Sequence, residues 1–216
     1  MVEIKFCGMT RPEDAAQAAA LGARYVGVIL AEGPRTLTDD AAQTVFTALP
    51  KGVARVGVFG VASPEKVADR ATRLGLDVVQ LHGDPDARAV SALRALWSGQ
   101  VWAVLRVEGA EVPDVSGDLF DVADGVVLDA RVAGKLGGTG VALPWDELRD
   151  RVAAFRGRRA RFVLAGGLRP ENVARAVEVL RPDVVDASSG IEAAVGVKDH
   201  KRMRAFREAA LAVHAP

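Results

Sequence analysis

Short apolar segments alternate with helical patterns along the chain, and this alternation limits the fold more than any other feature of the sequence. Eight segments have strand character and recur at intervals of roughly 20 to 30 residues, as in a (β/α)8 barrel. They cover residues 2–7, 24–30, 54–59, 77–82, 101–107, 125–129, 161–165 and 183–187. Several are rich in Val, which is typical of strands buried on both faces of a parallel sheet. We therefore predict an α/β protein, a single TIM-barrel domain over residues 1–216.

Helical patterns follow most of these strands. They are predicted over residues 10–21, 38–49, 63–74, 84–97, 145–155, 170–180 and 198–213. Thr10 and Glu13 have the spacing of a capping box at the start of the first helix. Residues 108–120 show little helical periodicity, so a short or irregular element is predicted there. A doubly wound open sheet is the alternative fold, but residues 7–10 do not form the Gly-x-Gly-x-x-Gly turn of a dinucleotide site.

The charges of the sequence balance, because 28 Lys and Arg residues stand against 28 Asp and Glu residues. Without a bulk positive field, neither nucleic acid nor an anionic membrane is an expected partner. The single cysteine excludes an internal disulfide framework and a multi-Cys zinc site, so we expect a cytoplasmic protein. Histidines at positions 82, 200 and 214 lack metal-ligand spacing, and no metal site is predicted. No apolar run approaches the ~20 residues of a membrane span, and no targeting segment is expected.

Two turns in the last third of the chain have the composition of an anion-binding site. Gly166-Gly167 follows the seventh predicted strand and lets backbone approach a ligand without an intervening Cβ atom. Ser188-Ser189-Gly190 follows the eighth and offers N–H groups and hydroxyls before a short helical turn at Ile191. The loops after the last two strands of a parallel barrel are its usual phosphate site, so we predict a phosphate cradle here. The alternative is a pair of ordinary strand-to-helix turns.

Polar side chains also collect near the predicted carboxyl ends of the strands, where the catalytic residues of parallel barrels lie. They are Cys7, Arg35, Gln80, His82, Arg106, Asp129 and Asp186. Strand alternation directs Gln80 and His82 to the same face, away from the helices. Each residue alone has an ordinary explanation, since a lone Cys is most often a core residue and an Arg a solvated charge. Together they predict one polar cavity.

A glycine-rich loop, Gly137-Gly138-Thr139-Gly140, follows the sixth predicted strand. Just before it, Gly134-Lys135 has the Gly-Lys pair of a nucleotide P-loop. The match fails because Leu136 stands where a P-loop requires Ser or Thr after the lysine. We therefore do not predict nucleotide binding.

A set of motifs spread from the first strand to the last helix occurs together in this chain. They are Lys5-Phe-Cys-Gly-Met-Thr10, Arg55-Val-Gly-Val-Phe59, Val79-Gln-Leu-His-Gly83, Gly125-Val-Val-Leu-Asp129 with residues 137–140, Leu164-Ala-Gly-Gly-Leu168 with Pro170-Glu-Asn172, and Val185-Asp-Ala-Ser-Ser-Gly-Ile-Glu192 with Lys198-Asp-His200. This set resembles the phosphoribosylanthranilate isomerase family of tryptophan biosynthesis. The resemblance implies an α/β barrel that isomerises N-(5-phosphoribosyl)anthranilate to a carboxyphenylamino-deoxyribulose phosphate, with neither metal nor organic cofactor.

The resemblance also implies roles for three residues: Cys7 as general base, Asp129 as general acid and Arg35 as the ligand of the anthranilate carboxylate. An Amadori rearrangement needs an acid that protonates the ribose ring oxygen and a base that takes the proton from the adjacent carbon. Lys5, on the strand face of Cys7, is a candidate to keep the thiol partly ionised. Burial or a neighbouring carboxylate such as Asp186 is expected to keep Asp129 protonated.

The chain departs from the family pattern at two places. Glu32-Gly33 precede Pro34-Arg35, where the family usually has Ser-Pro-Arg, and Leu105-Arg106 stand where relatives often carry Lys. Arg106 is therefore a further candidate site residue. The alternative function is that of another phosphate-binding barrel, either a related sugar-phosphate isomerase or a catalytically silent binding protein. We expect a monomer or a homodimer.

Overall fold

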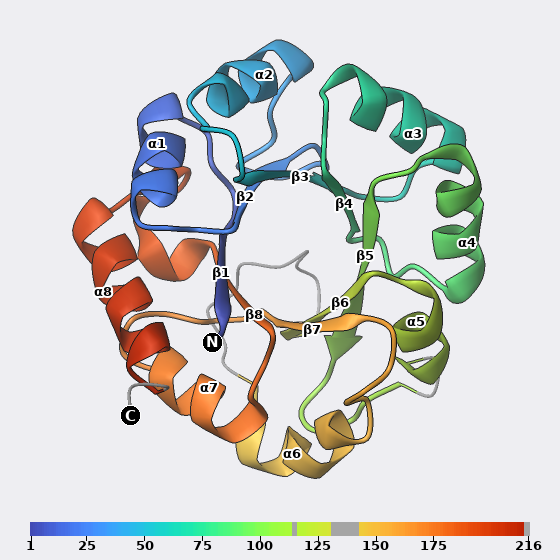
Figure 1. Ribbon diagram of the computed structural model, residues 1–216, viewed down its shortest axis with the longest axis vertical. Coiled ribbons are helices and arrows are strands. Elements are labelled where there is room, and N and C mark those ends of the chain that lie inside the picture. The colour runs from blue at the N-terminus through green and yellow to red at the C-terminus, as the bar shows by residue number, and fades with distance from the viewer. Residues whose placement is uncertain (114–115, 131–142, 214–216) are drawn as a thin grey trace.

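Eight parallel strands close into a barrel in the order of the sequence, and helices surround it (Figure 1). The computed structural model describes residues 1–113, 116–130 and 143–213. The strands are β1 (Glu3–Phe6), β2 (Tyr25–Ile29), β3 (Ala54–Phe59), β4 (Val78–Leu81), β5 (Gln100–Val107), β6 (Gly125–Ala130), β7 (Arg161–Leu164) and β8 (Val184–Ala187). Because β8 pairs with β1, the sheet has no open edge, which confirms the predicted TIM barrel and rules out the doubly wound sheet.

The helices form an outer ring around the strands (Figure 1). They are α1 (Pro12–Ala20), α2 (Asp39–Thr47), α3 (Pro64–Arg73), α4 (Ala87–Leu96), α5 (Ser116–Val122), α6 (Trp145–Ala153), α7 (Val173–Leu180) and α8 (His200–Ala212). Side chains at the caps decide where several of them begin. Thr38 and Asp86 accept hydrogen bonds from backbone N–H groups three residues later. α4 starts later than predicted because Asp84 adopts a left-handed conformation, with φ of 49°.

The capping box predicted at Thr10 and Glu13 is wrong. α1 begins after Arg11, whose side chain makes no cap hydrogen bond. The Thr10 hydroxyl instead donates to the carbonyl of Gly196, which is remote in sequence. A tertiary contact therefore uses the hydroxyl that a local cap would need.

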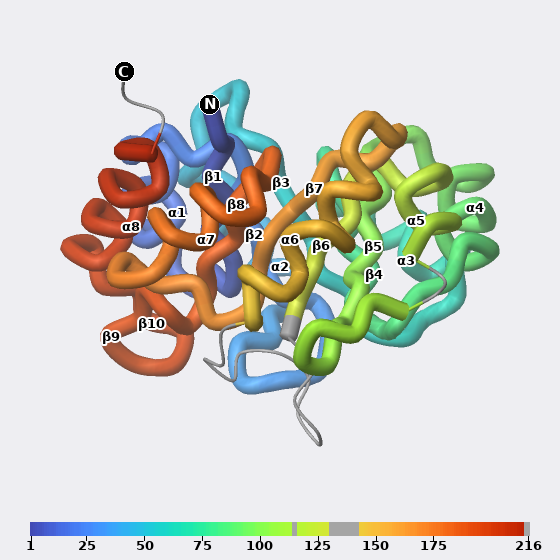
Figure 2. Tube along the Cα trace, turned by 90° about the horizontal axis from the view of Figure 1, so that it is seen from below, coloured from blue at the N-terminus to red at the C-terminus, as the bar shows by residue number. Residues whose placement is uncertain are grey.

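An additional hairpin lies between β8 and α8 and was not predicted. It follows a single 3-10 turn, η1 (Ser189–Ile191), at the position of the predicted helical turn, and consists of β9 (Glu192–Ala194) and β10 (Val197–Lys198). Figure 2 shows the hairpin on the face of the barrel opposite the N-terminus. It thus lies beside the loops that follow the carboxyl ends of the strands. Strands of three and two residues are too short to leave a period-2 pattern in the sequence.

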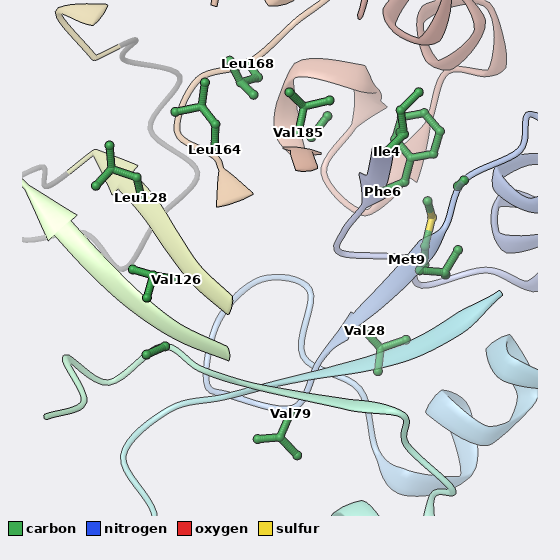
Figure 3. Close-up of a cluster of buried hydrophobic side chains, with 14 of the residues drawn as sticks. Ile4, Phe6, Met9, Val28, Val79, Val126, Leu128, Leu164, Leu168 and Val185 are labelled. Carbon is green, nitrogen blue, oxygen red and sulfur yellow. The ribbon is translucent and has the colours of Figure 1, made fainter. Parts of the chain in front are cut away.

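Two apolar clusters make up the core. The larger one fills the layer between strands and helices, where Phe6 of β1 meets Phe206 of α8 with ring centroids 5.9 Å apart. Figure 3 shows part of this layer. The smaller cluster lies inside the barrel, where Tyr25 and Trp102 pack edge to face at 4.7 Å. Apolar residues thus fill the interior of the barrel, and polar groups concentrate at the carboxyl ends of the strands.

Candidate active site

A cavity of about 770 Å³ opens at the carboxyl ends of the strands. Its wall contains eleven of the residues that the sequence analysis singled out. They are Cys7, Arg35, Gln80, His82, Asp129, Gly166, Gly167, Asp186, Ser188, Ser189 and Gly190. The barrel brings them together because every strand ends at the same face.

One wall of the cavity carries a buried ion pair between neighbouring strands. Lys5 of β1 lies opposite Asp186 of β8 in the register, and its Nζ donates to Asp186 Oδ2 at 2.6 Å. The Lys5 side chain is completely buried. Asp186 Oδ1 is also buried and has no hydrogen-bond partner among the described residues. The carboxylate therefore keeps one acceptor for a bound molecule.

Cys7 lies at the end of β1, with two ammonium groups close enough to act on it. Burial raises the pKa of the thiol, and the charges of Lys5 and Lys198 reduce this effect without cancelling it. The net pKa of Cys7 is above its ordinary value, so the thiol form predominates at neutral pH in the unliganded site. The two cations are nevertheless placed to stabilise the thiolate when it forms.

Gly8, which the sequence analysis did not single out, allows the loops to converge beside Cys7. Its φ of 69° lies in the left-handed region. A Cβ atom there would lie 2.9 Å from both Arg35 Cδ and Ser188 Oγ and 3.6 Å from Lys198 Nζ. Glycine is therefore needed here both for conformation and for space.

Gln80 and His82 extend from the β4 end of the barrel. Gln80 Oε1 and His82 Nδ1 are buried without a hydrogen-bond partner among the described residues. Burial, followed by the charges of Arg106 and Lys5, lowers the pKa of His82 to about 4, so its imidazole is neutral at pH 7. Two neutral polar side chains thus keep unused hydrogen-bonding atoms in the cavity wall.

Arg106 lies outside the cavity wall. Its Nη2 donates to the carbonyl of His82 at 2.6 Å, and Nη1 lies 3.4 Å from Asp84 Oδ2. The first of these bonds fixes the backbone of His82 at the end of β4. The structure thus gives Arg106 a supporting position and does not place it on the cavity wall.

The two predicted anion-binding turns lie side by side. Gly166 and Gly167 both have positive φ, at 79° and 66°. Asn172 closes this turn, since its Nδ2 donates to Gly167 O at 3.0 Å. A Cβ atom at Gly190 would lie 2.0 Å from Leu168 O, so only glycine lets the turn after β8 approach the turn after β7 this closely.

Arg35 reaches the cavity from the loop after β2 and pairs with Glu192 of β9. Glu192 also accepts from Lys198 Nζ at 2.9 Å. The sequence analysis quoted Glu192 and Lys198 within a motif but assigned them no role. Their presence in that motif is the one signal in the sequence that could have identified them. Strand and helix periodicity do not reveal a contact made by a hairpin.

The glycine-rich loop at residues 137–140 lies outside the described residues, as does position 214. Within the described ranges, no group of three or more His, Cys, Asp or Glu side chains is placed to hold a metal ion. No helix in the same ranges is both long enough and apolar enough to cross a membrane.

The closed barrel, with a polar cavity at the carboxyl ends of its strands, defines the chain as a (β/α)8-barrel protein whose candidate ligand site lies where parallel barrels bind their ligands. Comparison with known proteins narrows the class. The family described as N-(5'-phosphoribosyl)anthranilate (PRA) isomerase matches residues 4–209. The chain belongs to this isomerase family.

Individual relatives agree with this assignment. The N-(5'-phosphoribosyl)anthranilate isomerase of Rubrobacter xylanophilus is 41% identical, over 97% of this chain and 99% of the relative. A crystal structure of monomers of the dimeric phosphoribosylanthranilate isomerase from Thermotoga maritima has a TM-score of 0.84 and 32% identity, covering 98% of this chain and 100% of the other. Another crystal structure, of the isomerase with reduced 1-(o-carboxyphenylamino)-1-deoxyribulose 5-phosphate, has a TM-score of 0.81 and 31% identity, with the same coverage.

Proposed function

We propose that this chain catalyses the Amadori rearrangement of N-(5-phosphoribosyl)anthranilate to 1-(2-carboxyphenylamino)-1-deoxyribulose 5-phosphate, in the tryptophan pathway of the cytoplasm. The observation that carries the proposal is the shared cavity, which holds Cys7, Asp129, Arg35 and both glycine- and serine-rich turns. Such a cavity offers an acid, a base, a cation for a carboxylate and a cradle for a phosphate. The complex of a relative with the reduced product supports the same ligand class.

Ring opening is assigned to Asp129 as general acid. Asp129 is buried at the end of β6 and lines the cavity. A protonated carboxyl there gives its proton to the ribose ring oxygen, the C1–O bond breaks, and the nitrogen lone pair forms the C1=N bond of the Schiff base.

Proton removal is assigned to Cys7 as general base. The thiolate takes the proton from C2, and the electrons of the C–H bond form the enolamine, which tautomerises to the ketose. Lys5 and Lys198 stabilise the thiolate, because both charges oppose the effect of burial on the thiol. Base and acid thus come from the ends of two different strands, β1 and β6, and both line the same cavity.

The remaining cavity residues bind the substrate in this proposal. Arg35 holds the anthranilate carboxylate, and the turns of Gly166-Gly167 and Ser188-Ser189-Gly190 hold the phosphate. The atoms of Gln80, His82 and Asp186 that lack partners receive the sugar hydroxyls. No step requires a metal or organic cofactor. The dimeric Thermotoga relative, known also as monomers, supports action as a monomer or a homodimer.

A turnover assay tests the function. Purified protein mixed with phosphoribosylanthranilate should abolish the fluorescence of this substrate at an enzyme-dependent rate. A folded protein that leaves it unchanged but isomerises the aminoaldose substrate of the histidine pathway would support the related sugar-phosphate isomerase instead. Binding of the reduced product without turnover would support a catalytically silent barrel.

A further inference from the structure

Arg35 and Glu192 form a two-bond ion pair on the rim of the cavity. Arg35 Nε donates to Glu192 Oε1 at 2.7 Å, and Nη2 donates to Oε2 at 2.6 Å. The two side chains are only 12% and 6% exposed. A fork of two parallel bonds fixes the plane of the guanidinium as well as its position. It leaves Nη1 without a hydrogen-bond partner among the described residues.

The hairpin that carries Glu192 is itself fastened to the barrel. Thr10, before α1, donates to the carbonyl of Gly196 in the hairpin turn. The backbone N–H of Lys198 donates to Asp14 Oδ2 of α1 at 3.1 Å. Glu192 Oε1 also accepts from the N–H of Gly196 at 3.3 Å. The hairpin that carries Glu192 is therefore fastened at its turn and at β10, and the Glu192 side chain is bonded to that turn. Arg35, in contrast, lies in a connecting loop.

Lys198 keeps the cluster cationic. Its Nζ donates to Glu192 Oε1 at 2.9 Å and to the carbonyl of Ser188 at 3.1 Å. Burial alone raises the pKa of Glu192, but hydrogen bonds from Arg35 and the charge of Lys198 outweigh it and hold that pKa below its usual range. Burial lowers the pKa of Lys198, and the charge of Glu192 opposes that shift. With Lys198 charged, two cations share one carboxylate, and the cluster carries one net positive charge. An anionic ligand is attracted even though a carboxylate is present.

We propose that Glu192 is a positioning residue for Arg35, which it holds with Nη1 available to the carboxylate of the substrate. This inference rests on the proposed function, in which Arg35 binds the anthranilate carboxylate. Glu192 is not among the residues that line the cavity, so in this proposal it touches neither the substrate nor the reacting atoms. Its effect is to order the long Arg35 side chain before the substrate arrives, which lowers the entropy lost on binding.

Glu192→Gln tests the proposal, because it keeps the size of the side chain and removes its charge. The variant should raise KM for phosphoribosylanthranilate roughly 10-fold to 100-fold, with a much smaller change in kcat. Calorimetry should show a matching loss of affinity for the reduced product. Ribose 5-phosphate, which lacks the anthranilate, should inhibit wild type and variant equally. Glu178→Gln, which removes one of the two carboxylate partners of Arg175 on the surface of α7, is the matched control and should leave all values unchanged.

A double-mutant cycle separates positioning from general stability. If Glu192 acts through Arg35, adding Glu192→Gln to Arg35→Leu should raise KM no further. Glu192→Asp keeps the charge at shorter reach and should give an intermediate KM. It also provides the test if Glu192→Gln does not fold.

The outcomes that overturn the proposal are distinct. An unchanged KM and reduced-product affinity in folded Glu192→Gln would overturn the positioning role, as would losses that add fully in the double variant. A wild type that neither turns over phosphoribosylanthranilate nor binds the reduced product would overturn the proposed function itself, and the inference with it.

Discussion

Lys5 Nζ lies 2.6 Å from Asp186 Oδ2, across the seam where β1 and β8 close the barrel. The two residues are 181 positions apart, and their side chains are 0% and 7% exposed. A buried ion pair gains little over apolar packing, but the loss of one partner is costly because the other charge stays buried. The pair also lies beside Cys7, so it links closure of the barrel to the proposed base.

Lys5→Met should lower the free energy of unfolding by about 3–5 kcal/mol, because it leaves Asp186 buried without its cation. Urea denaturation monitored by circular dichroism measures this change. Lys51→Met replaces an exposed lysine and is the control. A loss no larger than that of the control would contradict a buried charge pair.

Cys7→Ser should lower kcat by about 10²–10⁴-fold with little change in substrate affinity, because the hydroxyl keeps the shape but is too weak a base. Steady-state kinetics and calorimetry with the reduced product measure the two effects. Near-full activity in Cys7→Ala would make Cys7 a core residue and direct the search for the base to His82, Asp186 and Lys5.

Alkylation of wild-type protein reports the pKa of the same thiol. Because burial raises the pKa of Cys7, inactivation by iodoacetamide should accelerate with pH through a midpoint above the ordinary thiol value of about 8.5. The reduced product should protect the enzyme. The signal is specific, since the sequence contains one cysteine. A midpoint at or below 8.5 would contradict the expected direction.

Asp129→Asn should also lower kcat by about 10²–10⁴-fold, because the amide keeps a similar shape but cannot supply the proton for ring opening. Its alkylation profile at Cys7 should still show a titrating thiol. Single-turnover fluorescence measures the chemical step directly. Loss of substrate binding with kcat retained would indicate a binding role for Asp129 and not an acid.

Ser189→Glu should weaken phosphate binding, because a second negative charge would lie against that of the ligand. We expect a loss of about 2–5 kcal/mol in affinity for the reduced product. Ser189 is a better test position than Gly167, whose positive φ would add backbone strain. Ser189→Ala separates the lost hydroxyl from the added charge. An unchanged KM in folded Ser189→Glu would remove this turn from the site.

His82 should make stability depend on pH. Its pKa falls to about 4 on folding from an ordinary 6.5, so between these values the unfolded chain binds a proton that the folded chain does not. At pH 7 the imidazole is neutral in both the folded and the unfolded chain, so its pKa shift does not change the free energy of unfolding. That free energy should fall by about 2 kcal/mol as the pH drops from 6.5 toward 4, with the partial exposure of His82 taken into account. Urea unfolding of wild type and His82→Gln at pH 7 and pH 5 measures the difference. An equal pH dependence in both proteins would exclude His82 as the cause.

Much of the molecule was predictable because it depends on local patterns. The Val-rich strands, the helix that starts near Thr38 and the turns at Gly166 and Ser188 each depend on a few neighbouring residues. Parallel closure then brings strand ends to one face whatever the details of packing. For this reason eleven candidate residues between Cys7 and Gly190 could be named from the sequence. The structure shows that all eleven line one cavity.

Contacts between distant segments were decided only by the tertiary structure. Thr10 donates to Gly196 and not to its own helix, and Arg35 pairs with Glu192 from 157 positions away. Neither choice can be read from spacing, because a side chain bonds to whichever partner the closed barrel brings within about 3 Å. The sequence by itself determined the elements, their order and the face on which polar residues gather. The pairing of buried charges depended on closure, since burial makes an unpaired charge costly and only the folded chain brings Lys5 to Asp186 and Glu192 to Arg35.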